Sequence, residues 1–435
     1  MANAYIVAAL RTAGGRRGGR LSNWHPVDLG AQVINALIET TETDGSMIDD
    51  VIFGSVSQIG EQAMNVARNV VLSSKLPQSV PGTSIDRQCG SSQQALHFAA
   101  QAVMSGTMDA VIAGGVESMT RVPMFSTVAL PRKNDMGFYM SPGIRQKYPD
   151  VEFSQFMGAE MMADKYQLTK DELDEYALLS HQRASAATHN KAFEREIVSI
   201  HLRDAEGNET SDTHEIDEGI RFDATLEGIA GVNPISDGGK LTAASASQIC
   251  DGASAVLVVN DNGLKKLKMD PMVSIRHMSV IGHDPVIMLE APIPATESAL
   301  KKAGLSIGNI DLFEVNEAFA SVPLAWLKAT GADINKLNVN GGAIALGHPL
   351  GSSGSKLATT LIHAMVNQNQ RLGLQTMCEG GGMANVTIFE NCMVKRSRWL
   401  TNSNRVGSTE MLKSSTKRSS DFLILRWCQM TSKRE

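Results

Sequence analysis

The sequence contains the same order of segments twice, and this repeat constrains the fold more than any other feature. Each copy has a proline-led helical segment, a short apolar run and a serine-rich helical segment, which occupy residues 26–39, 49–56 and 91–104 in the first copy and 292–305, 310–315 and 352–365 in the second. Each serine-rich segment leads to a glycine cluster, VIAGG in the first copy and TMCEGGG in the second. The repeat indicates an internal duplication.

Apolar runs of strand length alternate with helical patterns in both copies. Residues 4–10 and 110–113 are expected to form buried strands, the second of them closed by two glycines. An amphipathic helix is expected over 170–187, because Thr169 and Glu172 have the spacing of a capping box. The alternation predicts an α/β fold with mainly parallel, mixed sheets packed in layers.

The repeat also predicts the domain organisation. The first half is expected over residues 1–120 and is completed by about 243–270, and the second half is expected over 271–392. The less regular residues 121–242 are expected to be an inserted loop domain that carries substrate-covering loops, since such loops commonly carry binding groups on a rigid scaffold.

Cys89 lies where a polar, glycine-containing stretch changes into a helical pattern. Apolar residues recur at helical spacing from residue 95 onward, so Cys89 is expected at or just before a helix start. The unpaired backbone N–H groups and the dipole at a helix start favour negative charge, which predicts a thiol inclined towards thiolate. The alternative is a buried structural cysteine, because free cysteine is among the most buried residue types.

Three further motifs carry chemically useful side chains. His348 lies among glycines, Asn316 and Glu317 follow an apolar run, and Cys378 precedes three glycines. Taken singly, each fits a loop histidine, a helix cap or a tight turn. All four motifs fall at corresponding strand ends, where open α/β sheets place ligands. Because corresponding turns of a duplicated sheet can meet at a pseudo-twofold axis, Cys89 and His348 are expected to face each other.

Composition describes an ordinary globular chain of 435 residues with a net charge of −6. Its longest apolar runs are too short to span a bilayer, and no signal peptide is indicated. The five cysteines, at positions 89, 250, 378, 392 and 428, are scattered and odd in number, without the spacing of metal ligands. A disulfide framework is therefore not expected, and a reducing, cytoplasmic location fits.

The last segment, residues 393–435, differs from the rest of the chain. It carries ten Lys or Arg residues against three Asp or Glu residues and is dense in Ser and Thr. One interpretation is a basic arm for nucleic acid or anionic lipid. The favoured interpretation is a disordered appendage, because apolar periodicity is almost absent.

Together, the motifs resemble those of one known protein family. From residue 4 to residue 390 the chain resembles the thiolase family of acyl-CoA C-acyltransferases in both motif content and motif order. The motifs that match are IVAALRT, VIFGSVSQIGEQAMNVAR, the Cys89 segment, GGVESM, CDGASAVLV, NEAFA, GGAIALGHPLGSSG and CEGGG. The resemblance implies duplicated βαβαβ halves, homodimers or homotetramers, CoA thioesters as substrates, and no metal or redox cofactor.

The resemblance also assigns roles to the candidate residues. Cys89 would be the nucleophile that accepts an acyl group, His348 its base, and Cys378 the acid and base for the second substrate. One oxyanion hole would come from His348 with a water held by Asn316, and the other from the backbone N–H groups of Cys89 and Gly380. Stabilising a thioester oxyanion requires such preorganised donors.

CoA is expected over the inserted domain. By the family pattern its contacts would include Ser247, Arg221 and Phe319. Gln248 and Cys250 depart from the pattern near this site, which leaves the accepted acyl chain open. The direction of the reaction is open too, whether cleavage of a 3-ketoacyl-CoA in β-oxidation, in association with other enzymes of that pathway, or condensation of acyl-CoA units.

Two alternatives to a thiolase remain at this stage. A ketoacyl synthase would use a carrier-protein partner and a second histidine or an asparagine in place of Cys378. A catalytically silent CoA-thioester-binding or structural protein could share the scaffold, although it need not keep Cys89, His348, Asn316 and Cys378 together. A nucleic-acid partner is not expected.

Overall fold

The computed structural model describes residues 3–393, so the predicted basic tail lies outside the described residues. The strands are β1 (Tyr5–Thr12), β2 (Gly15–Arg16), β3 (Asp50–Gly54), β4 (Gly82–Ile85), β5 (Ala110–Ser118), β6 (Ile197–Val198), β7 (Ile200–Arg203), β8 (Glu209–His214), β9 (Cys250–Val259), β10 (Val273–Gly282), β11 (Leu312–Val315), β12 (Leu372–Glu379) and β13 (Met383–Asn391). The helices are α1 (Pro26–Thr41), α2 (Val66–Ser73), α3 (Ser91–Ser105), α4 (Ser126–Lys133), α5 (Pro142–Lys147), α6 (Gln155–Lys165), α7 (Lys170–His189), α8 (Leu226–Ala230), α9 (Asp261–Leu267), α10 (Pro292–Ala303), α11 (Ser321–Thr330), α12 (Ala343–Leu346) and α13 (Ser353–Asn367).

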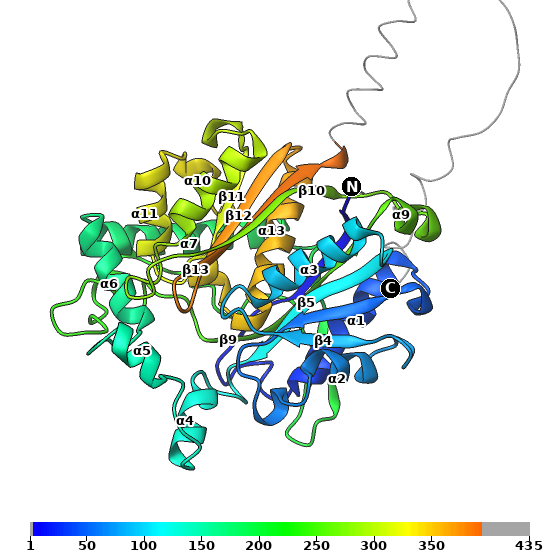
Figure 1. Cartoon of the computed structure of the whole chain (residues 1–435), viewed down its shortest axis with the longest axis horizontal. Helices are drawn as coiled ribbons and strands as arrows, with labels where there is room; N and C mark the ends of the chain where they lie inside the picture. The colour runs from blue at the N-terminus through cyan, green and yellow to red at the C-terminus, as the bar shows by residue number, and fades with distance from the viewer. Residues whose placement is uncertain (1–2, 394–435) are drawn as a thin grey trace, which may run out of the picture. The chain divides into compact units, whose positions relative to one another are not determined.

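The strand order of the main sheet is symmetric with respect to the two repeated halves. Its strands follow the order β11-β12-β13-β10-β1-β9-β5-β3-β4. Counted outward from the centre of the sheet, the first-half strands follow the order β1, β9, β5, β3. The second-half strands follow the corresponding order β10, β13, β12, β11. The two halves lie side by side, blue to cyan for the first and yellow to orange for the second (Figure 1). The predicted duplication is therefore confirmed, and β9 lies between β1 and β5 in the sheet.

The sheet is mixed, but the expectation of mainly parallel strands holds only towards its two ends. β3 pairs in parallel with β4 and β5, and β11 pairs in parallel with β12. From β5 to β12 each pair of neighbours in this order is antiparallel, and the short β6 pairs in parallel with β1 beside that order. In the second half the cause is a short connection: Gly381 and Gly382, with φ of +84° and +75°, turn β12 directly back into β13.

Helices and strands form the expected layers. The apolar residues of β5 alternate between two cores, because Ile112 and Val116 pack with α1 and α2, whereas Val111 and Ala113 pack with α3 and α13. On the far side, α10 and α11 cover the second-half strands. The order is therefore helices, strands, central helices, strands, helices, as Figure 1 shows. Burial on both faces explains why these strands are continuous apolar runs.

The prediction that two glycines close the strand after residue 113 is wrong. Gly114 and Gly115 lie inside β5, which continues to Ser118. A Cβ atom on Gly115 would lie 2.2 Å from the carbonyl oxygen of Gly351. The glycines thus permit close approach of the second half's loop and do not form a turn.

The central helices bring the two repeated helix starts into contact. The backbone N–H of Ser355 donates to Oγ of Ser92 at 2.9 Å, and a Cβ on Gly354 would lie 2.1 Å from the backbone nitrogen of Gln93. The expectation that corresponding turns meet is confirmed for the first turns of α3 and α13. Residues just before these two helices therefore come from sequence-distant segments but lie in one region.

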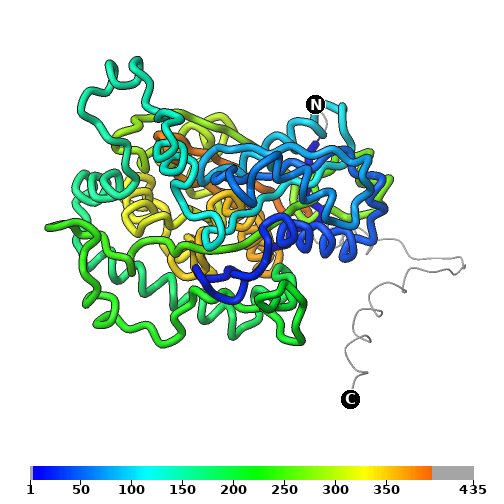
Figure 2. Tube along the Cα trace, turned by 90° about the horizontal axis from the view of Figure 1, so that it is seen from below, coloured from blue at the N-terminus to red at the C-terminus, as the bar shows by residue number. Residues whose placement is uncertain are grey.

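The residues between the halves contain α4 to α8 and the small β7–β8 sheet. In Figure 2 the cyan-green beginning of this region, with α4 and α5, lies at the upper left, and its green part runs along the lower side. The predicted capping box of α7 is present, with Thr169 and Glu172 bonded in both directions. No helix among residues 3–393 is both long and apolar enough to cross a bilayer.

Candidate active site

Cys89 lies on a tight turn immediately before α3, whose N-cap is Gly90. Gln88 has a left-handed backbone, with φ of +49°, and its N–H donates to Oδ1 of Asp86 at 2.6 Å. Ser91 closes the turn, because its Oγ accepts from the N–H of Arg87 at 2.9 Å and donates to the carbonyl of Gln88 at 2.6 Å. The predicted position of Cys89 at a helix start is confirmed.

The expectation that this thiol inclines towards thiolate is wrong for the resting site. Burial of the sulfur, followed by the charge of Glu379, raises the pKa of Cys89 to about 12. The helix start is too weak to offset both effects, because a helix dipole contributes on the order of 1 kcal/mol at partly exposed positions. Cys89 is therefore a protonated thiol until another group removes its proton.

His348 follows α12 and is oriented by the start of α13. Its Nδ1 lies 2.5 Å from Oγ of Ser353, and that hydroxyl donates its only proton to the carbonyl of Pro349 at 2.9 Å. Both contacts are satisfied when Nδ1 carries a proton and donates it to Ser353, which leaves Nε2 as the acceptor. The backbone N–H of His348 also donates to the carbonyl of Gln248 at 3.1 Å.

The imidazole is neutral at physiological pH. Burial, together with the nearby ammonium of Lys356, lowers the pKa of His348 to about 3. Lys356 is itself buried and donates from Nζ to the carbonyls of Leu346 and Gly347, at 3.0 and 3.3 Å. The lysine thus holds the loop before His348 and disfavours a second positive charge there.

Asn316 faces the imidazole from the end of β11. Its Nδ2 lies 3.4 Å from Nε2 of His348, whereas its Oδ1 is buried without a hydrogen-bond partner among the described residues. A buried polar atom without a partner is costly in a finished core and common where a ligand or water belongs. The amide oxygen of Asn316 is therefore a candidate acceptor for a substrate or water hydrogen bond beside His348.

Cys378 and Gly380 lie at the end of β12, next to the Cys89 turn. Cys378 is fully buried, and burial and then the charge of Cys89 raise the pKa of its thiol. A Cβ atom on Gly380 would lie 2.9 Å from Oε1 of Gln88. The two predicted cysteine segments are thus in contact, and their sulfur atoms are close enough to interact electrostatically.

Asn316 and Glu317 are adjacent in the sequence but have different partners in the structure. Glu317 is buried and accepts hydrogen bonds from the Tyr176 hydroxyl at 3.0 Å, the Ser180 hydroxyl at 2.7 Å and the Ile344 N–H at 3.1 Å. It fastens α7 of the insertion to the loop that carries His348. Glu317 is therefore a structural anchor rather than a helix cap.

Sequence reasoning missed three residues around His348. Ser353 and Lys356 orient the imidazole and its loop, and Gln248 fixes that loop by donating to the carbonyls of Gly219 and Ile344 at 2.7 and 2.8 Å. No sequence signal separates Ser353 from the neighbouring serines. Gln248 does have a sequence signal, because it departs from the family pattern at this position.

A cavity of about 440 Å³ lies between the insertion and the second half. Its lining residues include Arg221, His181, Gln248 and Ile344. Ala246, which also lines it, and Gln248 are the sequence neighbours of Ser247. Of the three predicted CoA contacts, Arg221 therefore lines this cavity, and Ser247 lies beside it.

Phe319 lies deeper than a direct contact would require. Its side chain is only 3% exposed and packs edge-to-face on Phe156 at 5.6 Å.

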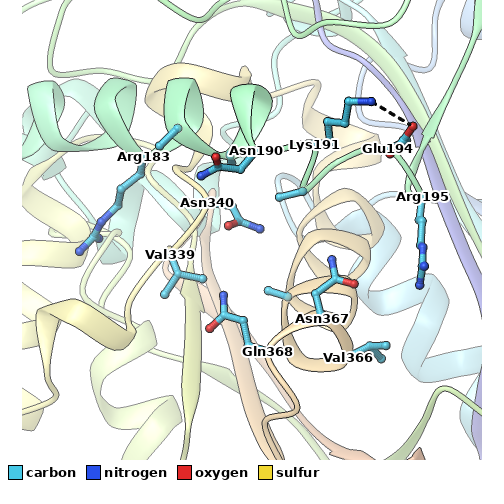
Figure 3. Close-up of a pocket in the computed structure, with 14 residues that line it drawn as sticks. Arg183, Asn190, Lys191, Glu194, Arg195, Val339, Asn340, Val366, Asn367 and Gln368 are labelled. Carbon is cyan, nitrogen blue, oxygen red and sulfur yellow. Dashed lines mark ion pairs between the residues drawn. The ribbon is translucent and has the colours of Figure 1, made fainter.

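A larger cavity of about 800 Å³ lies elsewhere, between the C-terminal ends of α7 and α13 (Figure 3). Amide and charged side chains line it, among them Asn190, Asn340 and Arg195. None of the predicted site residues belongs to it. His348 is instead linked to the smaller cavity, because its backbone N–H donates to the carbonyl of the lining residue Gln248.

Comparison with known families matches residues 4–262 to the N-terminal domain of thiolase and residues 269–391 to its C-terminal domain. The chain is 49% identical to the steroid 3-ketoacyl-CoA thiolase FadA6 of Mycobacterium tuberculosis, an alignment that covers 90% of this chain and 94% of that protein. It is 41% identical to a 3-ketoacyl-CoA thiolase of Yersinia pestis, covering 90% of this chain and 100% of that one.

Solved structures agree with this assignment. The crystal structure of human mitochondrial 3-ketoacyl-CoA thiolase superposes with a TM-score of 0.80 at 35% identity, covering 90% of this chain and 99% of that one. The Bacillus anthracis acetyl-CoA acetyltransferase superposes with a TM-score of 0.82 at 32% identity, with the same coverage of the two chains. The chain therefore belongs to the thiolase family and is an acyltransferase.

Proposed function

We propose that this thiolase cleaves 3-ketoacyl-CoA through an acyl intermediate on Cys89. Sγ of Cys89 attacks the 3-keto carbonyl, and Nε2 of His348 accepts the thiol proton. The bond between C2 and C3 then breaks, which leaves the acyl group on Cys89 and releases the enolate of acetyl-CoA. The observation that carries this proposal is the contact between the two cysteine segments. The buried amide of Asn316 supports the role of His348, because its Nδ2 lies 3.4 Å from Nε2 of the imidazole.

Cys378 would supply the proton that the enolate needs. Its thiol is protonated at rest, because burial raises its pKa, and it is therefore ready to donate. The Cys378 thiolate then takes the proton of a CoA thiol, whose sulfur attacks the acyl group on Cys89. The new acyl-CoA leaves as Cys89 regains the proton held by His348. Condensation of two acyl-CoA units is the same sequence in reverse, with Cys378 taking the proton.

The resting protonation states support proton transfer during attack rather than before it. A thiol with a pKa of about 12 and an imidazole with a pKa of about 3 are both neutral when the site is empty of substrate. A preformed thiolate–imidazolium pair is therefore disfavoured. Substrate binding would make transfer favourable by placing the attacked carbonyl against the backbone N–H groups of Cys89 and Gly380. His348, with a water held by Asn316, would stabilise the other oxyanion.

The cavity beside Ser247 supports the CoA position. Arg221 offers a cation at its rim for a phosphate, and Gln248 links the cavity to the loop of His348. Relatives named for 3-ketoacyl-CoA cleavage favour the degradative direction, and one relative is named for steroid substrates. Bulky 3-ketoacyl-CoA thioesters are therefore the first substrates to test.

The test combines chemical labelling with activity. Thiolysis of acetoacetyl-CoA and of longer and bulkier 3-ketoacyl-CoAs is measured by loss of the 3-ketoacyl thioester absorbance. Iodoacetamide is expected to label Cys89, found by peptide mapping, and to abolish activity, as is the variant Cys89→Ala. Cys392→Ser, which removes another partly exposed thiol, is the matched control and retains activity. An active Cys89→Ala variant would overturn the proposal.

We also propose a homodimer or homotetramer in the cytoplasm. β4 is an edge strand of the main sheet, and unpaired edge strands are natural sites for pairing with a second copy. Light scattering coupled to size-exclusion chromatography measures the assembly directly. A monomer at micromolar concentration would contradict it.

A further inference from the structure

Glu379 is a buried carboxylic acid that the mechanism above does not use. It follows Cys378 in β12, and its side chain is 0% exposed. Because successive side chains of a strand point to opposite faces, Glu379 faces the start of α3 while Cys378 faces the other core. A Cβ atom on Gly90 would lie 1.9 Å from Oε1 of Glu379. The carboxyl group therefore rests against the residue that follows Cys89.

The polar surroundings of this carboxyl group are incomplete. In the amide orientation that satisfies both its polar atoms, Asn385 donates to Oε1 of Glu379 at 2.8 Å and accepts from the N–H of Gln94 at 3.2 Å. Oε2 of Glu379 is buried and has no partner among the described residues, and the same is true of Nε of Arg87. The Arg87 guanidinium instead contacts Sδ of Met383 at 3.6 Å.

This arrangement favours a protonated carboxyl group. Burial raises the pKa of Glu379 to about 8, and the nearby Arg87 only partly opposes that rise. The titratable groups around it are Asp86, Arg87 and Cys89 on the turn and Cys378 on its own strand, while β13 presents the neutral Asn385. When Glu379 ionises, its charge raises the pKa of Cys89 and of Cys378.

We propose that Glu379 is a positioning residue of the thiolase site, which supports the Cys89 turn through Gly90 and sets through its charge how readily the Cys89 thiol loses its proton. The proton that Glu379 holds at neutral pH keeps the site free of a second negative charge. Above pH 8 the carboxylate forms and opposes ionisation of Cys89. This inference rests on the proposed role of Cys89 as the nucleophile.

The variant Glu379→Gln separates this role from mere packing, because it keeps the shape and removes the charge. The rate of iodoacetamide labelling at Cys89, followed by peptide mapping, is measured from pH 6 to pH 10. At pH 6 the two proteins are expected to react equally, since Glu379 is already neutral. At pH 9 the variant is expected to react about tenfold faster, as one charge a few ångströms away shifts a pKa by about one unit.

Two further variants complete the comparison. Glu314→Gln neutralises another buried carboxyl group, on β11, and is expected to leave the labelling profile unchanged. Glu379→Asp keeps an ionisable group and is expected to restore the slower labelling at alkaline pH. Superimposable profiles for the native protein and Glu379→Gln, or a change by the same factor at every pH, would overturn the proposal, because packing alone explains either result.

The readouts distinguish this proposal from the proposed function. If Cys89→Ala is active, the nucleophile has been misassigned, whatever Glu379 does. If Cys89→Ala is inactive and Glu379→Gln leaves the labelling profile unchanged, only the proposed role of Glu379 is wrong. In steady-state thiolysis, Glu379→Gln is expected to move the alkaline limb of kcat by about one pH unit with little change in KM.

Discussion

Oγ of Ser353 lies 2.5 Å from Nδ1 of His348 and donates its own proton to the carbonyl of Pro349. One hydroxyl therefore decides which imidazole nitrogen can accept a proton. Ser353→Ala removes this constraint, and we expect kcat to fall about 10- to 100-fold. The change in KM should be smaller, because the orientation of the imidazole matters mainly in the transition state. Steady-state thiolysis measures the split. Ser353→Thr keeps the hydroxyl and should recover activity, and an equally impaired Thr variant would argue against the tautomer role.

Gly90 leaves no room for a side chain against Glu379. We expect Gly90→Ala to displace the Cys89 turn, since its new Cβ would lie 1.9 Å from Oε1 of Glu379. Activity and Cys89 labelling should fall at least tenfold, a loss of about 1.4 kcal/mol in transition-state stabilisation. Gly143→Ala is the control, because the nearest atom to its added Cβ is 3.8 Å away. Unchanged labelling in Gly90→Ala would show that the turn tolerates the shift.

Glu317 joins the insertion to the second half through buried hydrogen bonds. Glu317→Ala leaves several donors without a partner, so the free energy of unfolding should fall by about 3 kcal/mol or more. Urea denaturation followed by tryptophan fluorescence measures this loss. The exposed Glu175→Gln on the same helix should change the value by less than about 0.5 kcal/mol. A Glu317→Ala protein as stable as the native one would contradict the anchoring role.

Arg221 tests the position of CoA. Arg221→Ala removes the cation at the rim of the 440 Å³ cavity, and we expect KM for CoA thioesters to rise several-fold while kcat changes little, because the contact is the same in ground and transition states. The exposed Lys265→Ala on α9 removes a cation outside that cavity and serves as control. A rise of KM in both variants would point to a general charge effect.

Buried histidines predict a loss of stability in acid. Burial lowers the pKa of His97 and of His348 to about 3, and that of His181 to about 4. Unfolded histidines titrate near pH 6.5, so below that pH the unfolded chain binds protons that the native protein does not, and stability falls as pH falls. His97→Gln should reduce the loss between pH 7 and pH 5 by about 2 kcal/mol.

Urea denaturation at both pH values measures this loss. The exposed His189→Gln variant is the control. An unchanged loss in His97→Gln would mean that His97 is already charged in the native protein.

Much of the fold could be predicted from local pattern. The segment 26–39 became α1, the capping box marked the start of α7, and the repeat predicted both the symmetric sheet and the meeting of α3 with α13. Pairing direction could not be predicted, since it depends on strands that are distant in sequence. Gly115 was misjudged for the same reason, because its function is to admit a backbone segment from the other half of the chain.

The site shows a similar division. Motifs placed Cys89, His348, Asn316 and Cys378 at strand ends, and the structure brings their segments together. The protonation state of Cys89 could not be predicted, because a helix start is visible in sequence whereas burial and the charge of Glu379 are not. Electrostatics in a core depends on neighbours that only the folded chain supplies.

The position of β9 has a consequence for synthesis. β9 pairs with both β1 and β5, so the first sheet half stays open until residues 250–259 have been made. A nascent chain of some 120 residues would therefore carry two unsatisfied strand edges and no closed core, a state prone to mispairing. Cys89 is translated early, yet it can meet Cys378 only after the ribosome has passed that residue. Premature termination would thus yield a thiol-bearing fragment without acyl-transfer chemistry.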